Sequence, residues 1–286
     1  MVSRYAKQII FPEIGEEGQQ KLSRSRVVII GCGALGTVTA SILVRAGIGT
    51  VRIIDRDFIE THNLQRQILF DEKDIEERLP KAVAAERHLK KVNSSINIEG
   101  IVADVNYTNI EKYVDGFDLI LDGLDNMETR YLLNDVSLKK NIPWIYGAAV
   151  SSMGMTMTII PHVTPCLRCY SPYTEAGPLL NCDTSGVISP APVTVGALQS
   201  TEAIKVLIGS GDITRDLLYI DVWTGAFNRV KTHSRSDCPP DNGKYDFLDG
   251  KACNQVILLD ASIEVSRNTN SEATQASGNK PTRDLQ

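Results

Sequence analysis

Apolar and polar positions follow two alternating patterns between residues 20 and 150 of this 286-residue chain. Short continuous apolar runs, typical of parallel strands buried on both faces, are followed by segments whose apolar residues recur at helical spacing. The expected strands are 27–30, 50–55, 96–105, the first part of 117–126, and 143–150. The expected helices are 18–25, 34–46, 81–93, 109–114 and 131–141. This alternation predicts an α/β fold with a doubly wound, mostly parallel, Rossmann-like sheet.

The second half of the chain has a different pattern. Residues 154–161, GMTMTIIP, alternate like a strand of a more open sheet, and 216–233 suggest a hairpin. Between them, 195–209 form a strongly apolar segment that predicts a helix capped by Gly209. We therefore expect a smaller, more antiparallel C-terminal sheet region. The polar residues 265–286 offer little that could pack, which predicts a disordered tail.

Composition and charge exclude some classes of function. The chain is 42% hydrophobic and 23% charged, as is ordinary for a soluble globular protein. A net charge of −5 and a pI near 5.5 argue against nucleic acid or an acidic membrane as a partner. No run reaches the ~18 uncharged apolar residues of a transmembrane helix, and the N-terminus lacks the apolar run of a signal peptide. The six cysteines are unevenly spaced, unlike a secreted disulfide framework, so a reduced, cytoplasmic protein is expected.

A glycine-rich turn follows the first expected strand. GCGALG places Gly31, Gly33 and Gly36 in a G-x-G-x-x-G that opens a helix. Glycines allow a sharp turn and a close ligand, and the helix N-terminus offers free N–H groups to a phosphate. Asp55 ends the next strand, where a carboxylate can accept hydrogen bonds from ribose hydroxyls. Together these features favour a nucleotide site over a turn that only packs a strand against a helix.

The segment after Asp55 bears on which nucleotide binds. A dehydrogenase is the default, because Asp55 suits NAD. The segment 55–70, DRDFIETHNLQRQILF, instead carries a series of polar and charged side chains, namely Asp57, His62, Asn63, Gln65 and Arg66. Lys81 begins the next helix. Arg66 and Lys81 suit a triphosphate better than hydride transfer, although each alone also fits a solvated surface cation.

A second acidic turn follows another buried strand. LILDGLDN places Asp122, Asp125 and Asn126 at its carboxyl end, the edge at which open α/β sheets bind ligands. A carboxylate at this edge can hold the Mg²⁺ that accompanies the phosphates of ATP. The alternative is an acidic turn that only ends the strand.

The chain resembles a known family through five motifs in a fixed order. They are GCGALG, IIDRDFIETHNLQRQ, LPK, LDGLDN and PCLRC. In this order and spacing they resemble the ubiquitin-activating-type adenylyltransferases, which include the enzymes that activate sulfur-carrier proteins for molybdopterin and thiamine synthesis and for tRNA thiolation. The resemblance extends from about residue 4 to about residue 240, and NLQRQ together with LDN is more diagnostic than the glycines.

The resemblance implies a reaction and roles for residues. ATP would be bound, and the C-terminal glycine carboxylate of a ubiquitin-like or sulfur-carrier protein ending in Gly-Gly would attack its α-phosphate, giving an acyl-adenylate and pyrophosphate. The residues that would seat the nucleotide are the glycine loop with Ala34, Asp55, Asp57 and Asn126. Those that would contact its phosphates are Asn63, Gln65, Arg66 and Lys81, and Asp125 would bind Mg²⁺. Ala34 replaces a glycine common in the family, which is tolerable if its backbone angle is ordinary.

The N-terminal segment RYAKQ matches the family's opening at Arg4 and Tyr5. Lys7 stands where bacterial relatives carry an arginine that reaches the nucleotide of the partner subunit. Lysine keeps the charge but loses the planar fork, so Arg4 is the alternative for this role. By this resemblance the protein would be a homodimer.

Two further cysteines, Cys32 and Cys182, have different expected roles. Cys182 lies in a segment where some family members carry a cysteine that forms a thioester or persulfide with the carrier. Its polar surroundings would leave a thiol accessible, but related enzymes stop at the adenylate, so both readings stand. Cys32, inside the glycine loop, is expected to be structural.

Another pair, Cys166 and Cys169, forms a C-x-x-C, which is a redox pair, half of a metal site or chance. The family usually has a second C-x-x-C downstream, completing a Cys₄ zinc site. Here Cys238 is present, but Asp241 stands in the place of the fourth cysteine. Either Asp241 or Cys253 would complete a zinc site, or zinc is lost; the three thiols favour zinc.

These features predict an adenylyltransferase domain over 1–264, with a nucleotide-binding core at about 20–150 and a carrier-binding and zinc region at about 151–264. Three alternatives remain at this stage. They are a non-catalytic subunit of an activating heterodimer, an NAD-dependent oxidoreductase, and an enzyme that adenylates a small molecule or tRNA base. The presence of Arg66, Lys81 and Asp125 counts against the first, and NLQRQ together with Lys81 counts against the second.

Overall fold

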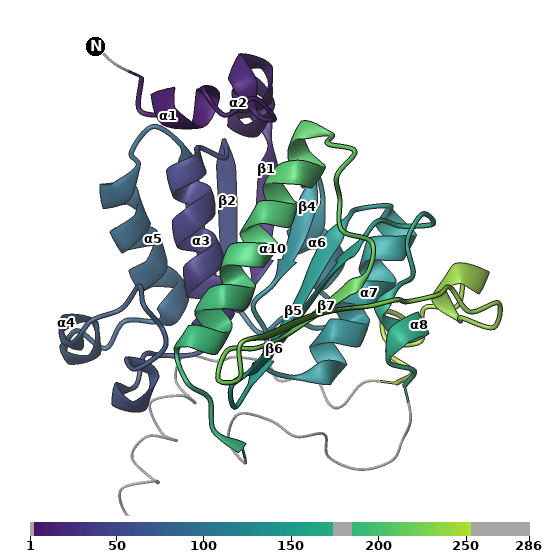
Figure 1. The fold of residues 1–286 in the computed structure, drawn as a ribbon. Coiled ribbons are helices and arrows are strands. Elements are labelled where there is room, and N and C mark those ends of the chain that lie inside the picture. The colour runs from purple at the N-terminus through teal and green to yellow at the C-terminus, as the bar shows by residue number, and fades with distance from the viewer. Residues whose placement is uncertain (1–2, 174–184, 253–286) are drawn as a thin grey trace, which may run out of the picture. The chain divides into compact units, whose positions relative to one another are not determined.

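A single eight-stranded sheet runs through the described part of the chain in the computed structural model (Figure 1). The structure describes residues 3–173 and 185–252, without the side chain of Asp241. The strands in chain order are β1 (Arg26–Ile30), β2 (Thr50–Asp55), β3 (Asn97–Val102), β4 (Leu119–Asp122), β5 (Trp144–Val150), β6 (Met153–Ile159), β7 (Leu217–Asp221) and β8 (Ala226–Val230). Their order across the sheet is β3-β2-β1-β4-β5-β6-β7-β8. The first five pair in parallel, whereas β6, β7 and β8 are added antiparallel.

Helices cover both faces of the parallel part. The α-helices are α1 (Ala6–Ile9), α2 (Gly15–Arg24), α3 (Ala34–Ala46), α4 (Glu72–Glu76), α5 (Lys81–Val92), α6 (Ile110–Val114), α7 (Met127–Lys140), α8 (Leu167–Tyr170) and α10 (Pro190–Ile208); short 3₁₀ helices are η1 (Thr61–Asn63) and η2 (Pro240–Asn242). The helices α3, α5 and α10 lie on one face of the sheet, and α6 and α7 lie on the other (Figure 1).

The apolar run of β1 shows why this architecture follows from the sequence. Val27 and Ile29 pack in the core beneath α3 and α10, whereas Val28 and Ile30 pack in the core beneath α6 and α7. All four side chains are buried, and each contributes roughly 1.5–3 kcal/mol to folding by leaving water. The doubly wound α/β fold with a more antiparallel C-terminal region, expected from the sequence, is confirmed.

The element boundaries follow the local capping chemistry. Gly47 and Gly209 adopt the left-handed conformation that ends α3 and α10, as expected of C-cap glycines. By contrast, α7 begins at Met127 rather than at residue 131, because the side chain of Asn126 accepts the Thr129 N–H and so caps an earlier turn. The helix α10 begins at Pro190 rather than at residue 195, with proline in its favoured first turn.

The sheet continues across residue 150, where the expected core and C-terminal region meet. β5 and β6 form an antiparallel hairpin whose register runs from Trp144 opposite Ile159 to Val150 opposite Met153. The two regions therefore share one sheet. The expected tail 265–286 lies outside the described residues. Within the described ranges, none of the helices has the length and apolar character to cross a membrane.

Candidate active site and cysteine cluster

The strand order creates a switch point between β1 and β4. From β1 the chain moves outward through β2 and β3 and returns to β4 on the other side, so the turns after β1 and β4 lie next to each other. The N–H of Gly123 donates to the carbonyl of Ile30 over 2.8 Å, and a Cβ on Gly31 would lie 2.6 Å from the carbonyl oxygen of Gly123. Open α/β sheets bind ligands outside such a switch point, at the carboxyl ends of the strands.

The three glycine positions of the fingerprint differ in why a glycine is needed there. Gly31 has φ +91°, and Gly36 leaves no room for a side chain, because its Cβ would lie 2.0 Å from the carbonyl oxygen of Gly31. Gly33, the N-cap of α3, would place a Cβ no closer than 3.7 Å to any neighbour, which is an ordinary contact. The fold therefore requires two of the glycines, whereas the third would accept a Cβ at the N-terminus of α3, whose free N–H groups can bind a phosphate. Ala34 is the first residue of that helix and is not among the residues with positive φ.

Asp55 ties the end of β2 to this turn. Its carboxylate accepts the N–H of Cys32 over 2.6 Å and the N–H of Asp57 over 2.7 Å. Burial raises the pKa of Asp55, although nearby Lys81 opposes the shift. Each carboxylate oxygen retains a second acceptor position, so the side chain can still bind ribose hydroxyls.

Lys81 begins α5 and points back to the same edge. Its side chain is 9% exposed, and its Nζ donates to Oδ2 of Asp57 over 2.9 Å. Burial by itself lowers the pKa of Lys81, but the carboxylates of Asp55 and Asp57 outweigh it, and the net shift is upward. The structure thus holds a protonated amine beside the glycine turn.

The polar segment between β2 and α5 is ordered by its own side chains. Asn63 is buried in η1, and its Oδ1 accepts the N–H of Glu60. Gln65 is exposed and reaches the carbonyl of Val187 over 3.4 Å. Arg66 is half-buried and donates to the carbonyl of His62 over 2.9 Å. No carboxylate pairs with Arg66 among the described residues, so most of its donors remain available to an anion.

The two carboxylates at the end of β4 and in the turn after it have different environments. Asp122 is fully buried and forms an ion pair with Arg130, whose Nε lies 3.0 Å from its Oδ2. Asp125 is exposed, and in the described part of the chain its one hydrogen bond is a long one of 3.4 Å from Asn126. Asp125 therefore keeps carboxylate oxygens free for a hard cation, which Asp122 does not.

Arg4 lies far from this edge of its own chain. Its Nη1 donates to the carbonyl of Val92 at the C-terminal end of α5, whereas Lys81 is at the N-terminal end. A twelve-residue helix is about 18 Å long, so the two side chains begin at opposite ends of that length. Lys7 is exposed on α1, near Arg4 in sequence. The predicted nucleotide-site residues from Gly31 to Asn126 lie around the carboxyl edge of the sheet, whereas Arg4 lies away from it.

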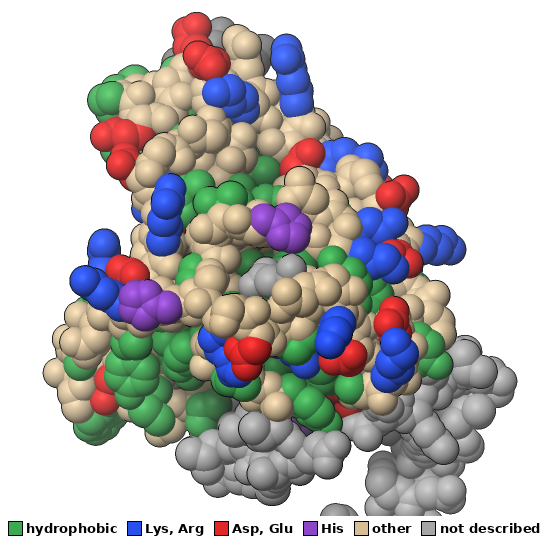
Figure 2. Space-filling model, turned by 90° about the vertical axis from the view of Figure 1, so that its right-hand side faces the viewer, with side chains coloured by type: hydrophobic (Ala, Val, Ile, Leu, Met, Phe, Trp, Pro, Cys, Tyr) green, Lys and Arg blue, Asp and Glu red, His purple; other side chains and the backbone are tan. Residues whose placement is uncertain are grey.

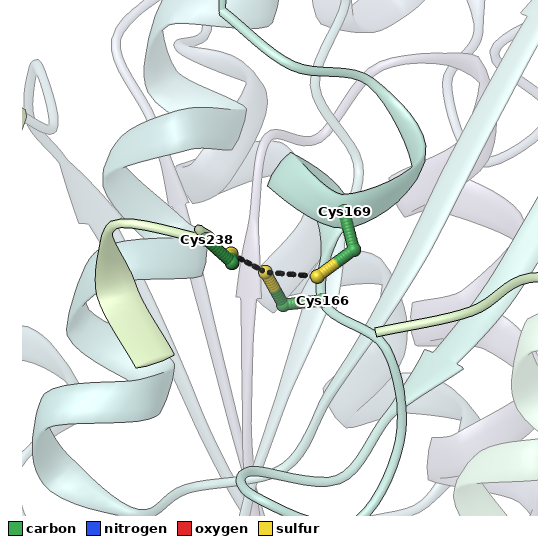
Figure 3. Close-up of side chains that lie close together, drawn as sticks. All are labelled: Cys166, Cys169 and Cys238. Atoms are coloured by element: carbon green, nitrogen blue, oxygen red, sulfur yellow. Dashed lines mark hydrogen bonds between the residues drawn. The ribbon is translucent and has the colours of Figure 1, made fainter. Parts of the chain in front are cut away.

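Three cysteine side chains converge beside α7. Figure 3 shows the sulfur atoms of Cys166, Cys169 and Cys238 turned toward one another, although Cys238 comes from a segment far along the chain. The Sγ of Cys166 lies 3.7 Å from that of Cys169 and 3.3 Å from that of Cys238, and all three residues are buried. Tetrahedral zinc with Zn–S bonds of about 2.3 Å separates its sulfurs by about 3.8 Å, so the cluster is close to the required spacing. The hydrogen bond from Cys166 lowers the pKa of Cys169, whereas hydrogen bonds within the cluster raise the pKa of Cys166 and of Cys238.

The remaining cysteine and aspartate predictions fall partly outside the described residues. The backbone of Asp241 lies in η2, close in sequence to Cys238, but its side chain is outside the described set, as are Cys182 and Cys253. Cys32 is fully buried in the core, and burial raises the pKa of its thiol well above the ordinary value. This supports the structural role expected of Cys32.

The sequence patterns did not predict a role for two residues at the carboxyl end of β4, Arg130 and Gln199. Both are buried and contact the turn after β4. Gln199 had only a weak signal, since it is one of several polar residues inside the segment 195–209. The signal for Arg130 was also weak, because Arg130 precedes 131–141, the segment whose apolar spacing predicted a helix.

The surface charge gives no sign of a nucleic-acid interface on the face shown in Figure 2. There, Lys and Arg side chains lie among Asp and Glu side chains rather than forming a continuous basic surface. This mixture agrees with the net charge of −5.

Comparisons with known proteins agree with this geometry. Residues 5–240 match the model of the ThiF family. The chain is 44% identical over 248 residues to the sulfur carrier protein ThiS adenylyltransferase of Bacillus subtilis, covering 86% of this chain and 73% of that protein. It is 38% identical over 240 residues to the SAMP-activating enzyme E1 of Haloferax volcanii, covering 83% and 88% of the two chains.

A solved structure supports the fold alone. The crystal structure of Escherichia coli MccB with ATP matches with a TM-score of 0.73 at 24% identity, covering 84% of this chain and 75% of that one.

Proposed function

This chain belongs to the ThiF family, and from that membership we propose that it catalyses the ATP-dependent adenylation of the C-terminal glycine of a ubiquitin-like or sulfur-carrier protein. The observation that carries the proposal is its similarity to the Bacillus subtilis sulfur carrier protein ThiS adenylyltransferase across most of both chains. The site supports it independently, because an open glycine turn, a protonated lysine and a free carboxylate meet at one edge of the sheet.

The reaction needs positioning and charge more than covalent participation by side chains. A carboxylate oxygen of the carrier's terminal glycine forms a bond to the α-phosphorus, and the bond from that phosphorus to the bridging oxygen breaks as pyrophosphate leaves. The N-terminus of α3 and Asp55 would seat the nucleotide, with Asp57 and Asn126 beside it. Arg66 and Lys81, with Asn63 and Gln65, would hold the phosphates and stabilise the charge that develops on the departing pyrophosphate.

Mg²⁺ fits the free carboxylate of Asp125. Oxygen ligands are what this ion prefers, and Asp125 is exposed with only a long hydrogen bond from Asn126 in the described part of the chain. Bound there with the nucleotide, the ion would neutralise phosphate charge. Asp122 would not serve as a ligand, because Arg130 and backbone N–H groups already occupy its carboxylate.

Zinc fits the cluster of Cys166, Cys169 and Cys238. The sulfur separations and the burial suit a closed structural site that fastens the C-terminal segment to the loop before α8. Asp241 or Cys253 would supply the fourth ligand. Zinc content of the wild type, Asp241→Ala and Cys253→Ala decides between them, and unchanged zinc in both variants rejects both ligands.

Assembly and location are part of the same proposal. A homodimer would bring Arg4 or Lys7 of one copy to the nucleotide of the other, which the position of Arg4 on its own chain favours. The residues from 1 to 264 would form the adenylyltransferase domain in the cytoplasm. Cys182 would accept the activated carrier as a thioester if the reaction continues past the adenylate.

ATP–pyrophosphate exchange tests the proposal. The full chain is incubated with ATP, Mg²⁺, labelled pyrophosphate and candidate carrier proteins ending in Gly-Gly. Label should enter ATP only when a cognate carrier is present, and a carrier that lacks the terminal glycine serves as the matched control. The absence of exchange with every carrier, accompanied by binding of NADH, would reject adenylation in favour of an oxidoreductase.

The non-catalytic alternative gives a different result in the same assay. A subunit of an activating heterodimer would bind a carrier or a partner chain without promoting exchange on its own. Exchange by the purified chain with a carrier, in the absence of any partner subunit, therefore excludes that role. Exchange stimulated by a small molecule or by tRNA, rather than by a carrier, would change the substrate class and keep the phosphate chemistry.

A further inference from the structure

A buried arginine fixes the turn that carries Asp125. Arg130, in the first turn of α7, is only 6% exposed, and its guanidinium donates three hydrogen bonds to oxygen atoms and a long one to the sulfur of Met127. Nε donates to Oδ2 of Asp122 over 3.0 Å, and Nη2 donates to the carbonyls of Leu124 over 2.6 Å and Gly147 over 2.9 Å. One side chain thus joins the end of β4, the turn after it and the middle of β5.

The end of β4 and the first half of β5 are also held from the opposite face of the sheet. Gln199, fully buried in α10, donates through Nε2 to the carbonyl of Asp122 over 2.9 Å and to that of Ile145 over 3.1 Å. Gly147 makes room for it, since a Cβ there would lie 2.4 to 2.8 Å from the amide of Gln199. Two helices on opposite faces therefore fix the carbonyls where β4 and β5 approach the site.

Asp125 depends on this arrangement for its position. Its side chain has little support of its own, because its one described hydrogen bond is the long one from Asn126. Its backbone, however, follows Leu124, whose carbonyl accepts from Arg130 and whose N–H donates to Asp122. Gly123, one residue earlier, touches the glycine turn, where a Cβ would lie 2.2 Å from the carbonyl oxygen of Gly31.

We propose that Arg130 is a positioning residue that holds the Asp125 carboxylate in register with the glycine turn and so sets the affinity of the site for the divalent cation of the nucleotide complex. This inference rests on the proposed function for the role of Asp125. The acceptors of Arg130 are groups of the protein itself, so it acts through the backbone of the turn. Side chains that orient the ligands of a metal commonly change its affinity by about 10- to 100-fold when they are replaced.

Arginine is required here rather than any cation. The three acceptors lie around a planar fork, and lysine, a single ammonium on a flexible stem, cannot bridge all of them. Arg130→Lys keeps the charge beside buried Asp122 and removes the bridge, so it separates positioning from charge compensation. Arg52→Lys is the matched control, because Arg52 also joins a carboxylate and a carbonyl, those of Glu99 and Tyr113, but in the β2–β3 part of the sheet.

The experiment measures cation binding and backbone opening directly. Mn²⁺ is titrated into each protein with a non-hydrolysable ATP analogue and followed by electron paramagnetic resonance, and amide hydrogen exchange is followed at residues 123–126. In Arg130→Lys we expect Mn²⁺ affinity to fall by about tenfold or more and these amides to exchange faster. Asp125→Asn should lose Mn²⁺ affinity with unchanged amide exchange, and Arg52→Lys should match the wild type in both measurements.

The outcomes separate this inference from the proposed function. Wild-type Mn²⁺ affinity and wild-type amide exchange in Arg130→Lys would overturn the positioning role, whatever the enzymatic assay shows. Faster exchange with unchanged Mn²⁺ affinity would also overturn it, since Arg130 would then stabilise the turn without affecting the ion. Failure of the wild type to promote ATP–pyrophosphate exchange with any carrier, by contrast, rejects the proposed function and is read from a separate assay.

Discussion

The Nζ atom of Lys81 lies 2.9 Å from Oδ2 of Asp57, at the edge of the sheet where β2 ends. Asp55 adds a second negative charge, and together the two carboxylates raise the pKa of Lys81 against the effect of its burial. The amine is therefore kept protonated and directed by groups of the protein itself. A charge fixed in this way needs little reorganisation when it stabilises developing negative charge on a phosphate.

Replacement of Lys81 by methionine should remove most of the activity while the protein still folds. We expect the rate of ATP–pyrophosphate exchange to fall by about 10²- to 10³-fold, the usual effect of removing one preorganised electrostatic group. Lys90→Met is the matched control, since Lys90 is on the same helix but pairs with Glu86 on the surface. Equal exchange rates in the two variants, with both proteins folded by circular dichroism, would contradict a phosphate-binding role for Lys81.

The glycine turn allows a test that separates folding from binding. Gly36→Ala should lower the free energy of unfolding by about 3 kcal/mol or more, because its Cβ would meet the carbonyl of Gly31. Gly33→Ala should change it by less than about 1 kcal/mol, since a Cβ fits there, yet it should weaken ATP binding by adding a methyl group where a phosphate would approach the N-terminus of α3. Urea unfolding and equilibrium ATP binding measure the two effects. Gly33→Ala with unchanged ATP affinity would place the phosphates elsewhere.

The sequence was most informative where a local cause determines the structure. The run 27–30 is apolar at every position because both faces of β1 are covered, and this alone indicates a central parallel strand. Gly47 ends α3 because a glycine enters the left-handed conformation without strain. Such features need only neighbouring residues, so they could be predicted before the fold was seen.

The supporting contacts of the site could not be predicted in the same way. Gln199 and Asp122 are 77 residues apart, and their hydrogen bond exists only because α10 packs across β4 and β5. The distinction between Asp122 and Asp125 is of the same kind. Both are aspartates in LDGLDN, but one is buried beside Arg130 and the other is exposed. Their separate tasks come from tertiary packing, about which spacing along the chain carries little information.

The proposed zinc site predicts that loss of a cysteine from the cluster destabilises the protein. We expect Cys238→Ser to lose bound zinc and to unfold about 5–10 °C below the wild type, because a closed structural site contributes its binding free energy to folding. Cys32→Ala is the matched control, as Cys32 is equally buried but lies outside the cluster. Atomic emission and thermal denaturation provide the measurements. Full zinc content in Cys238→Ser would remove Cys238 from the ligand set.

Asp135 couples the C-terminal segment to α7 through a buried carboxylate. Its Oδ2 accepts the N–H of Phe247 over 2.9 Å and that of Leu248 over 3.4 Å, whereas its Oδ1 is buried without a hydrogen bond in the described part of the chain. The nearest cation, the guanidinium of Arg168, is 3.9 Å away. Burial therefore outweighs these favourable contacts and raises the pKa of Asp135 to about 7.

This shift predicts a pH dependence of stability with a definite sign. Because the pKa is about 7 in the folded protein and near 3.8 otherwise, the folded state binds more protons than the unfolded state between those values. The contribution of Asp135 to the free energy of unfolding should therefore be greatest below about pH 4 and fall by up to about 1.4 kcal/mol per pH unit until about pH 7. Asp135→Asn does not titrate, so the stability of the wild type relative to this variant should decrease by about 3 kcal/mol from pH 4.5 to pH 7.5.

The control for this prediction is Asp115→Asn, a substitution of an exposed aspartate, which should have the same pH dependence of stability as the wild type. The free energy of unfolding is measured by urea unfolding at each pH. If the free energy of unfolding of the wild type minus that of Asp135→Asn is constant, or increases as the pH rises, the buried carboxyl is not the titrating group.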